Sequence, residues 1–229
     1  MRLRYTTLLF DLDGTLLDFE RNELRSLTTV LKEAGVQEME TAIACYRKVN
    51  HQLWADFERG LVSKQTIENT RFGRVFDQLG IKADDQSAVR RYRGLLMEGT
   101  DLIEGAQTLL EQLQGQAELD VVTNGDGPTQ RNRLAKTGLD RFFRHVFISD
   151  DLGVQKPQRE FFEIVLKTIE EKDPRKILVI GDSLSSDIQG GINAGLDTCW
   201  YHPEGTAAPK GPQPTWQIRR LQELPERLR

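Results

Sequence analysis

The hydrophobic and polar residues of this chain follow two different patterns. Between residues 20 and 98, apolar residues recur at helical spacing, and Gly35, Gly60 and Gly80 interrupt them. No run in this stretch alternates in the way that a half-buried strand does. The pattern therefore predicts four consecutive helices, over residues 20–34, 41–59, 63–79 and 84–98.

From residue 105 onward, short apolar runs alternate with helical segments. The apolar runs predict strands over residues 119–122, 145–148, 176–180 and 198–201. The segments between and after them predict helices over residues 106–113, 128–137, 159–169, 185–194 and 219–228. Strands that alternate with single helices are typical of βαβ units, which build a parallel sheet with helices on both faces.

A further strand is predicted near the start of the chain, from Thr6 to Phe10, because its apolar run is continuous. We therefore expect an α/β fold in which residues 1–17 and 99–229 form a parallel-sheet core. Residues 18–98 are expected to form an all-helical domain inserted between the first two strands. The segment GTAAPKGPQP, residues 205–214, predicts an exposed loop.

The composition narrows the range of partners. The 229 residues are 38% hydrophobic and 29% charged, with a formal net charge of −4 and dispersed basic residues, so no nucleic-acid footprint is expected. The two cysteines, Cys45 and Cys199, lack zinc-site spacing and fit a cytoplasmic protein. The first apolar run breaks at Asp11, too early for a signal peptide or a membrane span. We expect a monomer or homodimer with no membrane partner.

The first strand runs directly into two acids, in the stretch LLFDLDGT. Strand alternation places Asp11 and Asp13 on the same side of the backbone. At about 4 Å, with an effective dielectric near 20, their repulsion is of order 4 kcal/mol, so a proton or a cation has to relieve it. For an isolated pair of this kind, the alternative is that one acid caps a helix while the other is solvated.

Polar residues also follow the later strands, where the carboxyl ends of a parallel sheet form its ligand-binding edge. These residues are Thr123, Asn124, Asp182 and Asp187, and a later connection carries Lys156. Several carboxylates would repel an anion, yet the hydroxyl, amide and lysine groups suit phosphate oxygens. Mg²⁺, held by Asp11 and Asp182, resolves this conflict. One aspartate is then free to attack phosphorus while its neighbour moves the proton.

In their order and spacing, DLDGT, VTNG, KP and GDSLSSD resemble the four motifs of the haloacid dehalogenase superfamily of phosphohydrolases, across a whole Rossmann-like core. The resemblance implies that Asp11 is the nucleophile and Asp13 the general acid/base. It implies phosphoryl binding by Thr123 and Lys156, with Asn124 nearby. It also implies magnesium ligands from Asp11, Asp182 and the backbone carbonyl of Asp13, with Asp187 holding a metal-bound water or Lys156.

For two of these residues a plainer role stays open. Asp187 is also placed to favour the start of a helix, and Thr123 is also an ordinary residue for a strand end. The second aspartate of the first motif, Asp13, is absent from the dehalogenases that name the superfamily, so the resemblance favours phosphoryl chemistry. The helical insertion resembles the C1-type cap of this superfamily, which closes over the core and excludes water.

Two longer stretches resemble the bacterial pyrimidine 5'-nucleotidases of the same superfamily: residues 50–72, NHQLWADFERGLVSKQTIENTRF, and 181–200. The resemblance implies a nucleoside monophosphate as the small-molecule substrate. Aromatic residues on helices usually pack in a core, but Asn50, Trp54 and Arg71 are candidates to read the base or sugar. The alternatives are a phosphatase of another ester, such as phosphoglycolate or a sugar phosphate, and a non-catalytic phosphate-binding protein.

Overall fold

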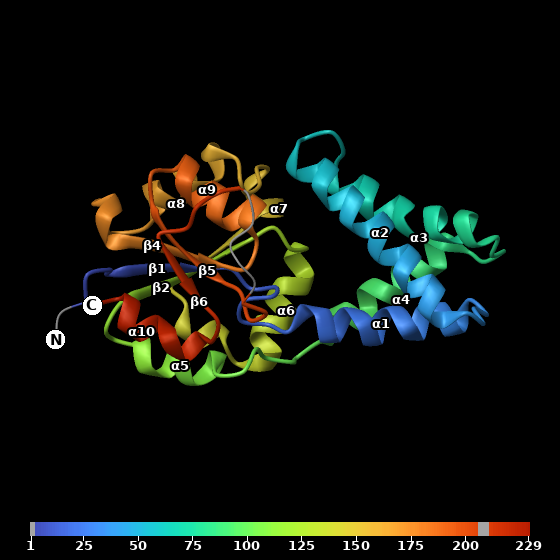
Figure 1. The fold of residues 1–229 in the computed structure, drawn as a ribbon, viewed down its shortest axis with the longest axis horizontal. Helices are drawn as coiled ribbons and strands as arrows, with labels where there is room; N and C mark the ends of the chain where they lie inside the picture. Colours follow the sequence, from blue (N-terminus) through green and yellow to red (C-terminus); the bar gives the residue numbers. More distant parts are fainter. Residues whose placement is uncertain (1–2, 206–210) are drawn as a thin grey trace. The chain divides into compact units, whose positions relative to one another are not determined.

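The computed structural model describes residues 3–205 and 211–229, and the chain forms two compact units. The first, here called the sheet unit, consists of Met1–Phe19 and Thr100–Arg229, and the second, the helical unit, is Glu20–Gly99. Figure 1 shows the strands gathered in the sheet unit and the long helices α1 to α4 in the other. Each unit has a hydrophobic core of its own.

The sheet unit is built on six parallel strands in the order β3-β2-β1-β4-β5-β6. The strands are β1 (Thr7–Phe10), β2 (Glu118–Thr123), β3 (His145–Ile148), β4 (Ile177–Gly181), β5 (Asp197–Tyr201) and β6 (Trp216–Ile218). Every residue of β1 and β4 is buried, as expected for strands covered on both faces. The predicted α/β class is confirmed.

Helices cover both faces of the sheet (Figure 1). On one face, Leu8 and Phe10 pack with residues of α5 (Ala106–Leu113), α6 (Gly127–Thr137) and α10 (Leu224–Arg227). On the other face, Leu9 packs with Phe161 and Phe162 of α8 (Arg159–Thr168), near α9 (Gln189–Asn193). Successive side chains of a strand point to opposite faces, so the single apolar run of β1 serves both layers.

The helical unit contains α1 (Phe19–Glu33), α2 (Met39–Glu58), α3 (Lys64–Leu79) and α4 (Asp85–Met97). Ser63 caps α3 by accepting from the Thr66 N–H, and Asp84 caps α4 by accepting from the Ser87 N–H, each at 3.1 Å. Gly80 ends α3 with a left-handed φ of +64°. The capping residues thus confirm the predicted breaks around α3.

A short pair of extended segments joins the sheet unit to its insertion. Leu17 and Leu102 form an antiparallel bridge, and the Asp18 N–H donates to the Asp101 carbonyl at 3.0 Å. Both segments belong to the sheet unit, so the chain leaves it and returns to it at one place. We call this bridge the neck.

The structure differs from the predicted elements mainly near the end of the chain. The predicted helix over 219–228 is a 3-10 turn, η4 (Leu221–Glu223), followed by the short helix α10. The predicted helix over 185–194 is a π-helical turn, η3 (Leu184–Ile188), followed by α9. Four short elements were not predicted: β6, α7 (Ser149–Leu152), η1 (Asp140–Phe142) and η2 (Pro174–Lys176). Residues 206–210 of the predicted loop lie outside the described residues.

Candidate active site

The carboxyl ends of three neighbouring strands bring the predicted polar residues to one edge of the sheet. β1 lies between β2 and β4. Asp11 follows β1, Thr123 ends β2 and Asp182 follows β4. The Asp11 N–H donates to the Ile180 carbonyl at 2.8 Å, which extends the pairing one residue beyond β1. This is the edge at which parallel sheets bind their ligands.

Lys156 connects the acids at the centre of this edge. Its Nζ donates to Asp11 Oδ1 at 2.7 Å, to Asp187 Oδ1 at 2.6 Å and to the Val122 carbonyl at 2.7 Å. Burial alone would lower the pKa of Lys156, but Asp11 and Asp187 raise it above its ordinary value, so the ammonium stays charged. The Asn124 amide donates to the Lys156 carbonyl and accepts from its N–H, both at 2.9 Å. Asn124 therefore fixes the backbone of the lysine.

Three carboxylates face one another beside Lys156. Asp11, Asp182 and Asp187 offer oxygen atoms that all lie within 4.8 Å of one another. Burial raises the pKa of Asp11 well above its usual range despite Lys156, and burial together with the Asp187 charge raises the pKa of Asp182 to about 7. A divalent cation would relieve this repulsion, and an all-oxygen set of donors suits Mg²⁺. The residues present therefore fit magnesium.

The turn after β1 packs closely on Asp182. Gly14 has a φ of +88°, and a Cβ on it would lie 2.5 Å from Asp182 Oδ2, so glycine is required for two reasons. Thr15 Oγ1 donates to Asp182 Oδ1 at 3.1 Å, and Trp200 Nε1 donates to the Asp182 carbonyl at 2.7 Å. Gly14 and Thr15 thus hold Asp182, which follows β4, next to Asp11, which follows β1.

Asp13 is held by two residues that the sequence patterns did not indicate. Arg133 Nη1 donates to Asp13 Oδ1 at 2.5 Å, and Gln130 Nε2 donates to Asp13 Oδ2 at 2.7 Å. Gln130 Nε2 also donates to Thr123 Oγ1 at 2.9 Å. Both residues lie on α6, and each is only 1% exposed. The position of Asp13 is therefore set by a buried arginine and a buried amide.

Replacing Arg133 should impair catalysis more than binding. In Arg133→Met we expect kcat to fall about 10- to 100-fold with a smaller change in KM, because Asp13 loses the group that fixes its position. Steady-state phosphate release would measure both constants. Arg131→Met is the matched control, since Arg131 lies on the same helix but is 54% exposed and pairs with Asp151. Equal kcat values in the two variants would contradict this role for Arg133.

The three residues predicted to read the substrate lie on α2 and α3 of the helical unit. Trp54 is partly buried and packs edge-on against Phe57, with ring centroids 5.5 Å apart. Arg71 is 8% exposed and donates to Tyr46 Oη at 3.2 Å and to Asn50 Oδ1 at 3.5 Å. Asn50 and Arg71 thus belong to one polar network within this unit. Their contact with a substrate stays a prediction.

Comparison with known proteins identifies the family. Residues 8–201 match the sequence profile of the haloacid dehalogenase-like hydrolases, which spans the sheet edge described above and the whole helical unit. The chain belongs to the haloacid dehalogenase-like hydrolase family. The family predicted from the sequence motifs is therefore confirmed.

Members of this family resemble the chain over nearly its whole length. The pyrimidine 5'-nucleotidase PynA of Streptococcus pneumoniae is 42% identical over 96% of this chain and 93% of its own length. The pyrimidine 5'-nucleotidase YjjG of Escherichia coli is 30% identical over 99% of both chains. The crystal structure of YfnB from Bacillus subtilis, described as bound to magnesium, has a TM-score of 0.92 with 41% identity, covering 98% of this chain and 99% of YfnB.

Within the described ranges, 3–205 and 211–229, no helix combines the length and the apolar character that crossing a membrane requires.

Proposed function

We propose that this hydrolase is a magnesium-dependent phosphomonoesterase that acts as a 5'-nucleotidase on pyrimidine nucleoside monophosphates. The observation that carries the proposal is the Lys156 ammonium, which joins Asp11 and Asp187 beside Asp182 while Asp13 is held separately by Arg133. This set provides one carboxylate to attack phosphorus, a second to transfer protons and a cation to bind phosphoryl oxygens. The names of PynA and YjjG support the substrate class.

In the first step, an Asp11 oxygen attacks phosphorus and forms an aspartyl-phosphate as the bond to the ester oxygen breaks. Asp13 donates its proton to the departing nucleoside oxygen, so the alcohol leaves neutral. Lys156 and the Thr123 hydroxyl bind the phosphoryl oxygens, on which negative charge is concentrated. Gln130 donates to both Asp13 and Thr123, which keeps the proton donor in register with the phosphate contacts.

In the second step, Asp13, now a carboxylate, accepts a proton from the attacking water, and the bond between Asp11 and phosphorus breaks to release inorganic phosphate. Mg²⁺, held by Asp11, Asp182 and the Asp13 carbonyl, would neutralise charge on the phosphoryl group when bound. Asp187 keeps Lys156 in place through the 2.6 Å contact. Asp13 thus loses its proton in the first step and regains one in the second.

We further propose that residues 18–98 act as a cap that selects the substrate, with Trp54 stacking on the base. The partial burial of Trp54 and the hydrogen bond from Arg71 to Asn50 support a preformed surface on the helical unit.

Cys45 and Cys199 are free thiols, which supports the cytoplasmic location predicted from the sequence.

A substrate panel tests this function. Phosphate release at fixed magnesium would be compared for pyrimidine and purine nucleoside 5'-monophosphates, phosphoglycolate and a sugar phosphate. We expect kcat/KM to be at least about tenfold higher for a pyrimidine nucleotide than for the other esters. A flat profile, or one centred on phosphoglycolate or the sugar phosphate, would remove the nucleotidase assignment and leave the phosphatase. Absence of turnover on every ester would remove both.

Two variants test the cap residue. Trp54→Ala should raise KM for the preferred nucleotide while leaving turnover of a small aryl phosphate unchanged, since the aryl ester has no nucleobase. Leu61→Ala is the control, because Leu61 lies in the same unit and is 66% exposed. If both variants behave alike, Trp54 does not read the base.

A further inference from the structure

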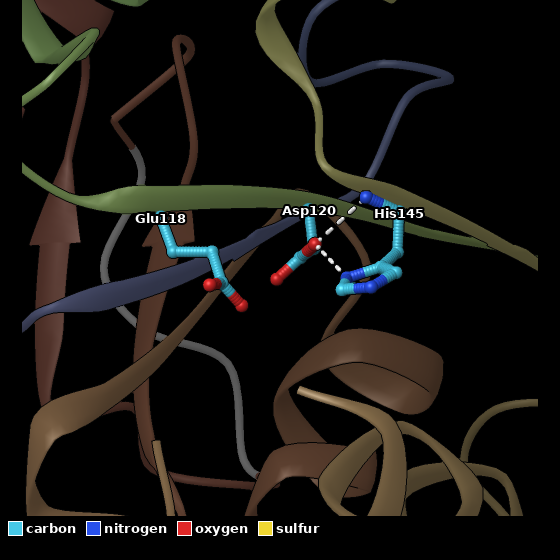
Figure 2. Close-up of side chains that lie close together, drawn as sticks. All are labelled: Glu118, Asp120 and His145. Carbon is cyan, nitrogen blue, oxygen red and sulfur yellow. Dashed lines mark hydrogen bonds and ion pairs between the residues drawn. The ribbon is translucent and has the colours of Figure 1, made fainter. Parts of the chain in front are cut away.

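A second group of ionisable side chains lies at the amino ends of the strands, whereas the candidate active site lies at their carboxyl ends. Glu118 and Asp120 are two residues apart on β2, so they share one face, and His145 is the register partner of Asp120 on β3. Figure 2 shows the three side chains together, with the His145 ring facing Asp120. Glu118 and Thr123 stand at the two ends of β2, five residue steps or about 16 Å apart. The group is therefore independent of the catalytic residues.

Asp120 is the anomaly in this group. Its side chain is fully buried, and the next residue on the same face, Val122, belongs to the apolar core beneath α8. Asp120 Oδ1 accepts from the His145 N–H at 2.9 Å and lies 2.8 Å from His145 Nδ1. Among the described residues, Asp120 Oδ2 has no hydrogen-bond partner although it is buried. In Figure 2 this oxygen is turned toward Glu118. A buried carboxylate oxygen left without a partner is costly.

Glu118 repeats the anomaly from the other side. Its Oε2 accepts from Arg144 at 2.7 Å, whereas its Oε1 is buried and unpartnered in the described part of the chain. Burial and the Glu118 charge raise the pKa of Asp120 to about 6, against the contacts with His145. Two carboxylate oxygens without donors therefore lie beside the His145 ring, and a cation would give both oxygens a partner while taking His145 Nδ1 as a third ligand.

We propose that Glu118, Asp120 and His145 form a binding site for a divalent first-row transition metal of the zinc type, which clips the edge strand β3 to β2. One ligand atom from each residue lies within 4.8 Å of the others. Ligand atoms that lie about 2.1 Å from one tetrahedral ion are about 3.4 Å apart, so the side chains have to close by at most about 1.4 Å to complete the site. Glu118, at 14% exposure with a flexible side chain, can supply that shift.

The donor set decides the class of metal. Imidazole suits zinc and its transition-metal neighbours, whereas Mg²⁺ and Ca²⁺ take oxygen ligands. The candidate active site offers only carboxylate oxygens in its acidic cluster. The two ends of the strands should therefore prefer different metals. We expect magnesium at the carboxyl ends, where the candidate active site lies, and a nitrogen-binding metal at the amino ends.

The consequence of metal binding is mechanical. β3 is the edge strand of the sheet and pairs only with β2 in the sheet order. The site would join the first residue of β3 to the first and third residues of β2, so it would oppose fraying of this edge without contacting Asp11 or Lys156. We therefore expect an effect on stability and none on turnover.

The test uses the full chain after chelator treatment, with Zn²⁺ and Mg²⁺ as probes in separate titrations. Thermal melting and calorimetric stoichiometry would be recorded for the wild type, Asp182→Asn and His145→Gln. Asp182→Asn weakens the catalytic cluster and should keep a zinc-induced rise in melting temperature of about 5–10 °C at a hundredfold excess over Kd. Adding His145→Gln to Asp182→Asn should remove that rise and one equivalent of zinc, and His145→Gln alone should retain wild-type kcat with magnesium.

Further readouts separate a metal site from an ordinary Asp–His pair. Asp120→Asn should also abolish the extra equivalent, and if it does not fold, His145→Gln alone decides the matter. The proposal is overturned if His145→Gln binds as much zinc as the wild type, or if Asp182→Asn shows no zinc-induced stabilisation.

Discussion

Asp11→Asn should reduce turnover of every phosphate ester by at least about 10³-fold. The amide oxygen is a far weaker nucleophile than a carboxylate, so the aspartyl-phosphate cannot form at a useful rate. The same change removes one of three clustered carboxylates, of which Asp11 carries a pKa raised by burial. We therefore expect the inactive protein to be folded and at least as resistant to heat. Phosphate release and thermal melting on one preparation measure the two effects.

The exposed acid Asp140, also in the sheet unit, provides the control. Asp140→Asn makes the same chemical change at the surface and should leave both turnover and melting close to wild type. Mass spectrometry after rapid quenching of the reaction should find one added phosphoryl group on the wild-type protein and none on Asp11→Asn. Wild-type turnover in Asp11→Asn would end the assignment of Asp11 as the nucleophile.

Lys156→Met should damage both stability and activity. The Lys156 side chain is 1% exposed and neutralises Asp11 and Asp187, so a methionine leaves two buried carboxylates without their cation. Breaking a buried ion pair by removing one partner typically costs about 3–5 kcal/mol, which corresponds to a fall in melting temperature of about 10 °C for a protein of this size. Thermal melting with and without magnesium measures this, and magnesium should restore part of the loss because it supplies positive charge.

The control for this variant is Lys167→Met, on the exposed side of α8. It removes the same charge from the surface and should move the melting temperature by no more than a degree or two, since surface charges contribute little. If Lys156→Met melts like the control, the Lys156 contacts do not neutralise the acids in solution.

Residues that follow strands could be placed from the sequence because strand order and chain direction leave little freedom. Once β1, β2 and β4 are parallel neighbours, Asp11, Thr123 and Asp182 must meet at one edge. Helix ends in the inserted segment could be predicted equally well, since Gly80 marks the point at which α3 ends. These features depend on local chemistry and on one rule about parallel sheets.

Contacts that depend on the rotation of a helix about its own axis were not readable. Gln130 and Arg133 are three residues apart and so share one face of α6, but only packing against the sheet turns that face toward Asp13. Polar residues such as these usually lie on a solvated helix face, so their residue types give no sign of the contact. The short strand β6 was missed for a different reason, because Trp216–Ile218 is too brief to show a period.

The neck between Leu17 and Leu102 gives this architecture a modular character. The chain leaves and re-enters the sheet unit at one hydrogen-bonded bridge. The four helices therefore form a single long loop whose two ends meet at the neck. The entropy of closing a loop rises by only about 0.6 kcal/mol for each doubling of its length, so the sheet tolerates insertions of very different size at this point. Evolution can therefore exchange the whole inserted segment in one event, while the strand ends that carry Asp11 and Asp182 and the loop that carries Lys156 stay as they are.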